Sequence, residues 1–134
     1  MIGDTDFFID LMRRRSAHHA KALAKIRELE GRGLRIAMTA VTRFELAFGI
    51  VGSLEPARER ERVLRAVESY PTYPLDGPSA DRAGAVHGTL RARGTGIGPV
   101  DALIAGIALE NGEPLLTRNL ADFRRIEGLV LDTY

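Results

Sequence analysis

The chain has 134 residues, of which 45% are hydrophobic and 28% are charged, and its formal net charge is +1. This length and composition are typical of one globular domain, so we expect a single domain over residues 1–134. The chain contains no cysteine, which excludes disulfides, thiolate metal ligands and cysteine nucleophiles. No leader pattern precedes the first strand-like segment, and no apolar run approaches the roughly 20 residues that span a bilayer. We therefore expect a soluble, cytoplasmic protein with no membrane partner.

Short apolar segments alternate with helical patterns along the chain, which predicts an α/β fold with a mainly parallel sheet. In the first half we expect strands over residues 1–4 and 34–40. A first helix is expected from about Asp6, and Ser16 is a candidate cap for a second one. The apolar face of that second helix is predicted to consist of Ala20, Leu23, Ala24, Ile26 and Leu29.

Two start signals follow the second predicted strand. Thr42 and Glu45 have the spacing of a capping box, which predicts that a helix begins there. Pro56 suits the first turn of the next helix, which we expect to reach Ser69. The second half of the chain is predicted to hold, in order, a strand at 73–76, helices at 78–93 and 99–110, a strand at 114–117, a helical turn at 119–125 and a strand at 129–131.

Several carboxylates are predicted to lie where strands end or helices begin. They are Asp4, Glu45, Asp101 and Asp122, the last with Asn119 nearby. Because the loops at the carboxyl ends of parallel strands meet in one crevice, we expect these side chains to come together there. A carboxylate cluster stays ionised only when cations neutralise it. Oxygen ligands favour hard cations, so the pattern indicates Mg²⁺ or Mn²⁺.

Each of these residues also has an explanation that needs no ligand. Asp4 suits a turn before a helix, and Glu45 completes a capping box. Asp101 complements the dipole of its helix, while Asn119 and Asp122 suit the cap of a helical turn. Taken singly, each of these explanations is the more common one. Only the joint placement of the residues favours a site.

Four segments resemble, in order, the motifs of the PIN-domain family and in particular of its VapC-type toxins. They are residues 4–11 (DTDFFIDL), 39–46 (TAVTRFEL), 101–108 (DALIAGIA) and 116–123 (LTRNLADF). The resemblance covers the whole chain and implies an α/β/α sandwich around a central, mainly parallel sheet. It implies that Asp4, Glu45 and Asp101 are the core catalytic acids and metal ligands.

The fourth motif leaves its ligand open between two residues. Asp122 is the candidate acid, and Asn119 is a candidate neutral ligand. The resemblance gives Thr5 and Thr117 roles that support these acids. Asp6 stands where relatives usually have asparagine or serine, and its extra charge leaves the number of bound metal ions open. For any single arginine a solvated surface is the more common explanation, and only Arg118 is favoured, because it lies inside a motif. The candidate phosphate ligands are Arg13, Arg14, Arg15, Arg91, Arg93 and Arg118.

The resemblance implies a Mg²⁺- or Mn²⁺-dependent endoribonuclease that hydrolyses phosphodiester bonds with a metal-activated water. It also implies a toxin role, a VapB-like antitoxin as partner, RNA as substrate and a homodimer. The alternative is a PIN fold that binds RNA or protein without catalysis. Asp4 and Asp6 also resemble the aspartate pair of haloacid-dehalogenase phosphatases and of response-regulator receivers. Both classes need a lysine late in the chain, and the only lysines are Lys21 and Lys25.

Overall fold

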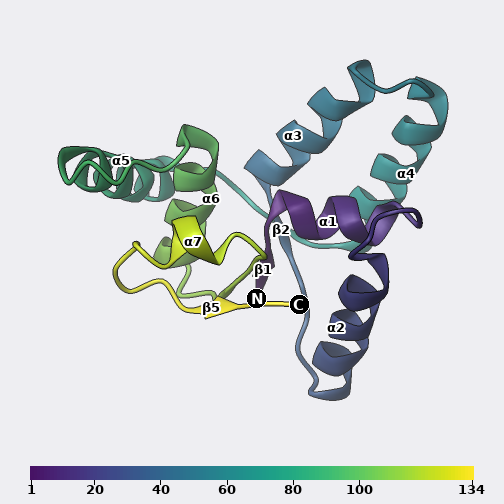
Figure 1. Cartoon of the computed structure of the whole chain (residues 1–134), viewed down its shortest axis with the longest axis horizontal. Helices are drawn as coiled ribbons and strands as arrows, with labels where there is room; N and C mark the ends of the chain where they lie inside the picture. The colour runs from purple at the N-terminus through teal and green to yellow at the C-terminus, as the bar shows by residue number, and fades with distance from the viewer.

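The computed structural model describes residues 1–134 (Figure 1). Along the chain the elements are β1 (Ile2–Gly3), α1 (Thr5–Met12), α2 (His19–Gly31), β2 (Met38–Thr39), α3 (Ala40–Val51), α4 (Pro56–Ser69), β3 (Thr72–Tyr73), α5 (Gly77–Ala92), α6 (Pro99–Glu110), β4 (Leu115–Leu116), α7 (Leu120–Phe123) and β5 (Leu131–Asp132). None of the helices has the length and hydrophobicity required to cross a bilayer.

The strands are short and all of their pairings are parallel. β1 pairs with β4, β4 with β5, and β2 with β3. A parallel bridge between Ile2 and Ala37 joins the two sets, so the strands run in the spatial order β3-β2-β1-β4-β5. The predicted α/β fold with a parallel sheet is therefore confirmed, with β1 at its centre.

Each face of the sheet carries its own hydrophobic core. Side chains of successive strand residues point to opposite faces, so Leu115 packs in the core with α6 and Leu116 packs in the core with α1 and α2. Figure 1 shows α5, α6 and α7 on one side of the strands and α1 to α4 on the other. At Gly3 a Cβ atom would lie 2.8 Å from the ring of Phe7, so only glycine lets α1 pack this closely on β1.

The predicted start of α3 is wrong by three residues. The helix begins at Ala40, and its N-cap is Thr39, whose hydroxyl accepts a hydrogen bond from the amide of Thr42 at 2.9 Å. Because β2 ends at Thr39, the helix starts as soon as the chain leaves the sheet. Thr42 is buried within the first turn and forms no capping box, and Glu45 therefore lies in the second turn.

The predicted cap and apolar face of α2 are also wrong in part. The helix begins at His19, and the hydroxyl of Ser16 bonds instead to the carboxylate of Asp10 on α1. Its buried residues are Ala22, Lys25 and Leu29, while the predicted Ala20 and Ala24 are exposed. The ammonium of Lys25 pairs with Asp132 of β5 at 2.9 Å. The hydrocarbon stem of this lysine therefore lies on the buried face of the helix.

The remaining predicted elements are confirmed, with ends shifted by at most four residues and with shorter strands than expected; α6 has the predicted bounds. Helix α4 has the predicted bounds, Pro56–Ser69. Helices α5 and α6 pack closely where Gly106 of α6 faces Ala83 of α5, since a Cβ on Gly106 would lie 2.6 Å from that of Ala83. This contact fixes α6, which carries Asp101, against its neighbour.

Candidate active site

A cleft of about 520 Å³ opens at the carboxyl end of β1, between α1, α3 and α6. Its polar lining comes from four separate parts of the chain: Asp4, Thr5, Asp6, Glu45, Asp101 and Asn119. The predicted convergence of acids at the strand ends is therefore present in the fold. Asp122 is the one predicted acid that does not line the cleft.

Asp4 is buried at the base of this cleft, with 5% of its surface exposed. As the N-cap of α1, its Oδ1 accepts a hydrogen bond from the amide of Phe7 at 2.8 Å. Its Oδ2 accepts a hydrogen bond from the hydroxyl of Thr117 at 2.5 Å. Burial raises the pKa of Asp4 to about 6, although both hydrogen bonds act in the opposite direction.

Glu45 and Asp101 approach the cleft from opposite sides. Glu45 on α3 accepts a hydrogen bond from the hydroxyl of Thr5 at 2.5 Å, which ties α3 to α1. Asp101 lies in the first turn of α6. Burial raises the pKa of Asp101, and the negative charges of Glu45, Asp122 and Asp6 raise it further. The cleft therefore concentrates carboxylates that repel one another.

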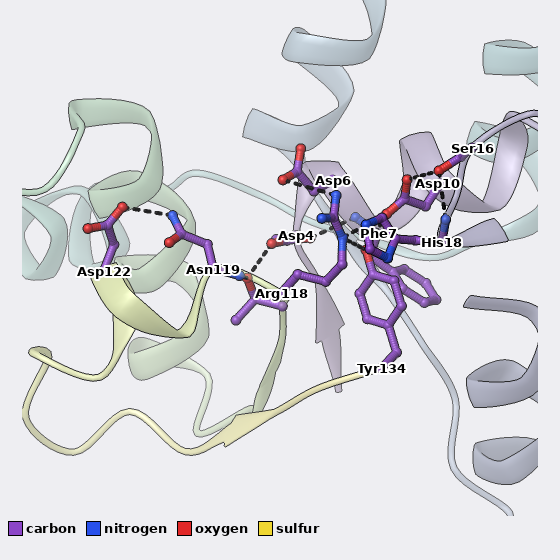
Figure 2. Close-up of polar contacts among 11 residues, drawn as sticks. Asp4, Asp6, Phe7, Asp10, Ser16, His18, Arg118, Asn119, Asp122 and Tyr134 are labelled. Carbon is purple, nitrogen blue, oxygen red and sulfur yellow. Dashed lines mark hydrogen bonds and ion pairs between the residues drawn. The ribbon is translucent and has the colours of Figure 1, made fainter. Parts of the chain in front are cut away.

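The fourth motif positions its two candidate ligands differently. The amide group of Asn119 lines the cleft and donates through Nδ2 to Asp122 at 2.8 Å (Figure 2). Asp122 lies on α7 behind Asn119 and also faces Arg125 at 3.7 Å. The backbone amide of Asn119 donates to the hydroxyl of Thr117, at 2.9 Å, so one threonine orients both Asn119 and Asp4.

Comparison with known proteins agrees with this architecture. The model of the PIN-domain family matches residues 1–129. The chain belongs to the PIN-domain family. Within it, the chain is 31% identical over 100 residues to the tRNA(fMet)-specific endonuclease VapC of Salmonella typhimurium, a match that covers 75% of this chain and 76% of that protein. The predicted resemblance to VapC-type members is thereby confirmed.

Solved structures show the same PIN fold over almost the entire chain. The DNA-bound VapBC of Salmonella typhimurium matches with a TM-score of 0.83 at 26% identity, over 98% of this chain and 96% of that one. VapBC2 of Rickettsia felis, bound to a DNA fragment of its promoter, has a TM-score of 0.84 at 20% identity, over 99% and 97%. The predicted PIN-like sandwich is therefore confirmed.

The donor chemistry of this PIN cleft fits a hard divalent cation. Carboxylate and amide oxygens are the ligands that Mg²⁺ and Mn²⁺ prefer. Burial raises the pKa of Asp101 most, and the neighbouring carboxylates add a repulsion that a cation would relieve. No three carboxylates or histidines in the structure are already arranged as a metal site. Asp4 and Glu45 are instead held by the threonine hydroxyls, so the carboxylates would turn toward a shared ion when it binds.

Arg118 follows β4, and its side chain forms a polar network with acids of α1 (Figure 2). Its Nε is 2.8 Å from Asp10, its terminal nitrogen is 3.6 Å from Asp6, and its guanidinium lies 5.9 Å from the centre of the Tyr134 ring. The hydroxyl of Tyr134 in turn donates to Asp10 at 2.8 Å. Arg118 is thus committed to protein partners, which favours a positioning role over a phosphate ligand.

Asp10, which anchors the Arg118 network beside the cleft, was not predicted from the sequence. It is buried, and although burial acts to raise its pKa, hydrogen bonds from Ser16 and Tyr134 and the charge of Arg118 lower the pKa overall. An acid on the apolar face of the helix that carries Phe7 was the available signal, because such a position needs a buried partner.

The other arginines suggested as phosphate ligands lie outside the cleft. Arg13, Arg14 and Arg15 line a separate groove of about 1090 Å³ between the end of α1 and α4. Arg91 and Arg93 lie at the end of α5, and neither lines the cleft. Nothing in this placement brings them to the carboxylates.

Proposed function

We propose that this PIN-domain chain is a divalent-cation-dependent endoribonuclease and the toxin of a VapBC-type toxin–antitoxin pair. The observation that carries the proposal is the set of Asp4, Glu45 and Asp101 on one cleft at the carboxyl end of β1. The relatives named VapC endonucleases support the activity. Hydrolysis is assigned to metal-assisted attack of water, because no serine, histidine or lysine lines the cleft and the chain has no cysteine. The two threonine hydroxyls beside the acids donate to Glu45 and Asp4.

In this proposal Asp4, Glu45 and Asp101 hold Mg²⁺ or Mn²⁺, with the amide oxygen of Asn119 as a neutral ligand. A bound ion of this kind would lower the pKa of its water and neutralise the charge of the scissile phosphate. Asp122 contributes negative charge and, through its hydrogen bond at 2.8 Å, orients the amide of Asn119.

The supporting residues act through the acids. Thr117 orients Asp4 and Thr5 orients Glu45, since each hydroxyl donates to the carboxylate at 2.5 Å. Asp6 adds exposed negative charge at the mouth of the cleft and pairs with Arg118. If Asp6 joins the ligand set, the cleft has one more carboxylate with which to hold a second ion. A titration of metal content would establish how many ions are bound.

We extend the proposal to the partners of the protein. The structural neighbours include complexes named VapBC, which supports a VapB-like antitoxin, and we expect a homodimer as the assembled form of the toxin. A single PIN domain over residues 1–134 is consistent with the family match to residues 1–129. An RNA substrate implies the cytoplasm as the site of action. Co-purification with the neighbouring gene product tests the antitoxin, and light scattering tests the dimer.

The activity is tested by incubating purified chain, freed of any antitoxin, with mixed cellular RNA and separately with initiator tRNA. We expect cleavage in Mg²⁺ or Mn²⁺ that EDTA abolishes and that Asp101→Asn lowers at least a hundredfold. Asp81→Asn, an exposed aspartate on α5, is the matched control and should cleave normally.

The competing function is a PIN module that binds RNA or protein without cutting it. Intact RNA in every pool, combined with RNA binding that does not depend on a divalent cation, would favour that module over the ribonuclease. Undiminished metal-dependent cleavage by Asp101→Asn would instead show that the nuclease lies elsewhere or is a contaminant.

A further inference from the structure

Two phenylalanine rings stand exposed on the wall of the acidic cleft. Phe44 and Phe48, one turn apart on α3, have 64% and 73% of their surface exposed, and both line the cleft that contains Asp4 and Asp101. The rings are nearly parallel, at 21°, with centroids 6.4 Å apart. α3 extends away from the sheet with α4 (Figure 1), and the exposure of the two rings shows that the core does not cover them.

The chemistry of this wall differs from that of the acids beside it. Phe44 and Phe48 line the same cleft as Glu45, so the apolar rings and the carboxylates face one cavity of about 520 Å³. A nucleotide has the same division, with an anionic phosphate and a flat, uncharged base about one sugar away. Base–aromatic stacking contributes about 1–3 kcal/mol per base and is tolerant of sequence.

We infer that Phe44 and Phe48 form a stacking platform for unpaired bases of the RNA whose phosphate lies at the carboxylates. The inference rests on the proposed ribonuclease function and adds two positioning residues, which would hold the bases of an unpaired segment beside the reacting phosphate. Bases inside a duplex are already stacked on their neighbours and cannot lie flat on a protein ring. The platform therefore selects unpaired segments while it reads little of their sequence.

The direct test uses a reporter ring, because the chain contains no tryptophan. Phe48→Trp is combined with Asp101→Asn, which prevents cleavage, and titrated with short single-stranded oligoadenylate. We expect the tryptophan fluorescence to be quenched by the oligomer and not by an abasic ribose-phosphate oligomer of equal length. The matched control is Val51→Trp, on the same helix and 84% exposed but outside the cleft; it should show no quenching.

A second measurement separates stacking from general hydrophobicity. In the otherwise wild-type chain, Phe44→Ala and Phe48→Ala should each raise KM for a single-stranded substrate about tenfold, whereas Val51→Ala should leave it unchanged. Phe48→Leu keeps an apolar side chain and should resemble alanine, while Phe48→Trp should restore the wild-type KM. Both rings are largely exposed, so these variants should retain the wild-type Tm.

Three outcomes would overturn the inference. One is RNA binding, seen by anisotropy, without quenching of the Phe48→Trp reporter, and another is equal quenching of the Val51→Trp control. The third is an unchanged KM in the alanine variants together with a changed oligomeric state, which would make the rings a protein–protein contact. Failure of the ribonuclease proposal looks different: the wild-type chain would then leave all RNA intact even where the reporter is quenched.

Discussion

The guanidinium of Arg118 and the carboxylate of Asp10 are 2.8 Å apart, and this ion pair joins the segment after β4 to the middle of α1. Asp10 is buried and Arg118 retains 30% of its side-chain surface. Since α1 begins with Asp4, and Thr117 precedes Arg118, the pair fixes the relative position of the two segments that form the base of the cleft.

Removal of this buried carboxylate should destabilise the fold. Asp10→Ala leaves Arg118, Ser16 and Tyr134 without their acceptor, and we expect a loss of about 2 kcal/mol in the free energy of unfolding. The value lies below the range for fully buried pairs because the arginine is partly exposed. Urea denaturation measures it. Asp6→Asn, which removes the exposed partner of the same arginine, should change stability by less than about 0.5 kcal/mol; equal losses in both variants would contradict the structure.

The stability of the metal-free protein should depend on the ionisation of Asp4. Its pKa is raised from 3.8 to about 6 in the folded state, so the contribution of Asp4 favours folding at low pH and is lost as pH rises through 6. This rise in the pKa of Asp4 corresponds to roughly 3 kcal/mol in the free energy of unfolding. Asp4→Asn keeps a good N-cap residue and should therefore unfold at higher urea concentration than wild type at pH 8, while the two should converge near pH 4.

Cleavage should have the opposite pH dependence, because only the ionised carboxylate attracts a cation. At subsaturating Mn²⁺ we expect the initial rate of the wild-type chain to rise with pH through about 6, because protons and the cation compete for Asp4. A rate that is flat from pH 5 to 8 at subsaturating Mn²⁺ would mean that protonation of Asp4 does not compete with cation binding.

Divalent cations should stabilise the folded chain through the same acids. Burial and the repulsion of nearby carboxylates raise the pKa of Asp101, and Mn²⁺ would relieve the repulsion. A ligand at 100 times its Kd adds about 2.7 kcal/mol. We expect Mn²⁺ to raise the Tm of wild type and EDTA to reverse the shift, as followed by differential scanning fluorimetry. Asp101→Asn should lose most of the shift and Asp81→Asn should retain it.

Thr117 should act on the reaction through Asp4. Its hydroxyl lowers the pKa of Asp4, so Thr117→Val should move the pH–rate profile to higher pH and reduce the rate at pH 7 about tenfold. Thr117→Ser retains the hydroxyl and should restore the wild-type profile. A uniform fall in rate at every pH, with no displacement of the profile, would indicate that Thr117 has a packing role only.

Gly106 should tolerate no larger residue. The Cβ of Gly106→Ala would lie 2.6 Å from the Cβ of Ala83 and from the carbonyl oxygen of Ser79, so we expect a loss of about 2–3 kcal/mol. Gly84→Ala, on α5 with no atom near the added Cβ, is the control and should be neutral or slightly stabilising. Chemical denaturation measures the free energy of unfolding of both variants, and an equal loss in the two would contradict the close contact at Gly106.

Local signals predicted much of this fold and of its cleft. Pro56 and Pro99 mark the starts of α4 and α6, and the apolar runs mark the strands. The start of α3 was not predictable from local signals, because Thr39 and Thr42 both suit an N-cap and the choice depends on where β2 stops pairing. A strand end is set by its neighbour in the sheet, which the local sequence does not contain.

The features that were not predicted depend on partners far away in the sequence. Lys25 pairs with a residue 107 positions away and Asp10 with one 124 positions away, so neither burial follows from helical spacing. The four cleft segments were predictable because the rule for parallel strands places their ends together. It was not predictable that Asn119 lines the cleft while Asp122 lies behind it, since this depends on the orientation of a four-residue helix.

Asp4 connects the folding of this chain to its chemistry. One carboxylate caps α1 and also lies at the base of the cleft, and its ionised form is disfavoured by burial. In the metal-free protein, the ionised form that can bind a cation is therefore the less stable form, an example of the trade-off between stability and activity. Any cation that fills the cleft will slow proteolysis of the chain, because it lowers the population of unfolded molecules on which proteases act. The lifetime of the protein in a cell will thus follow the occupancy of its cleft.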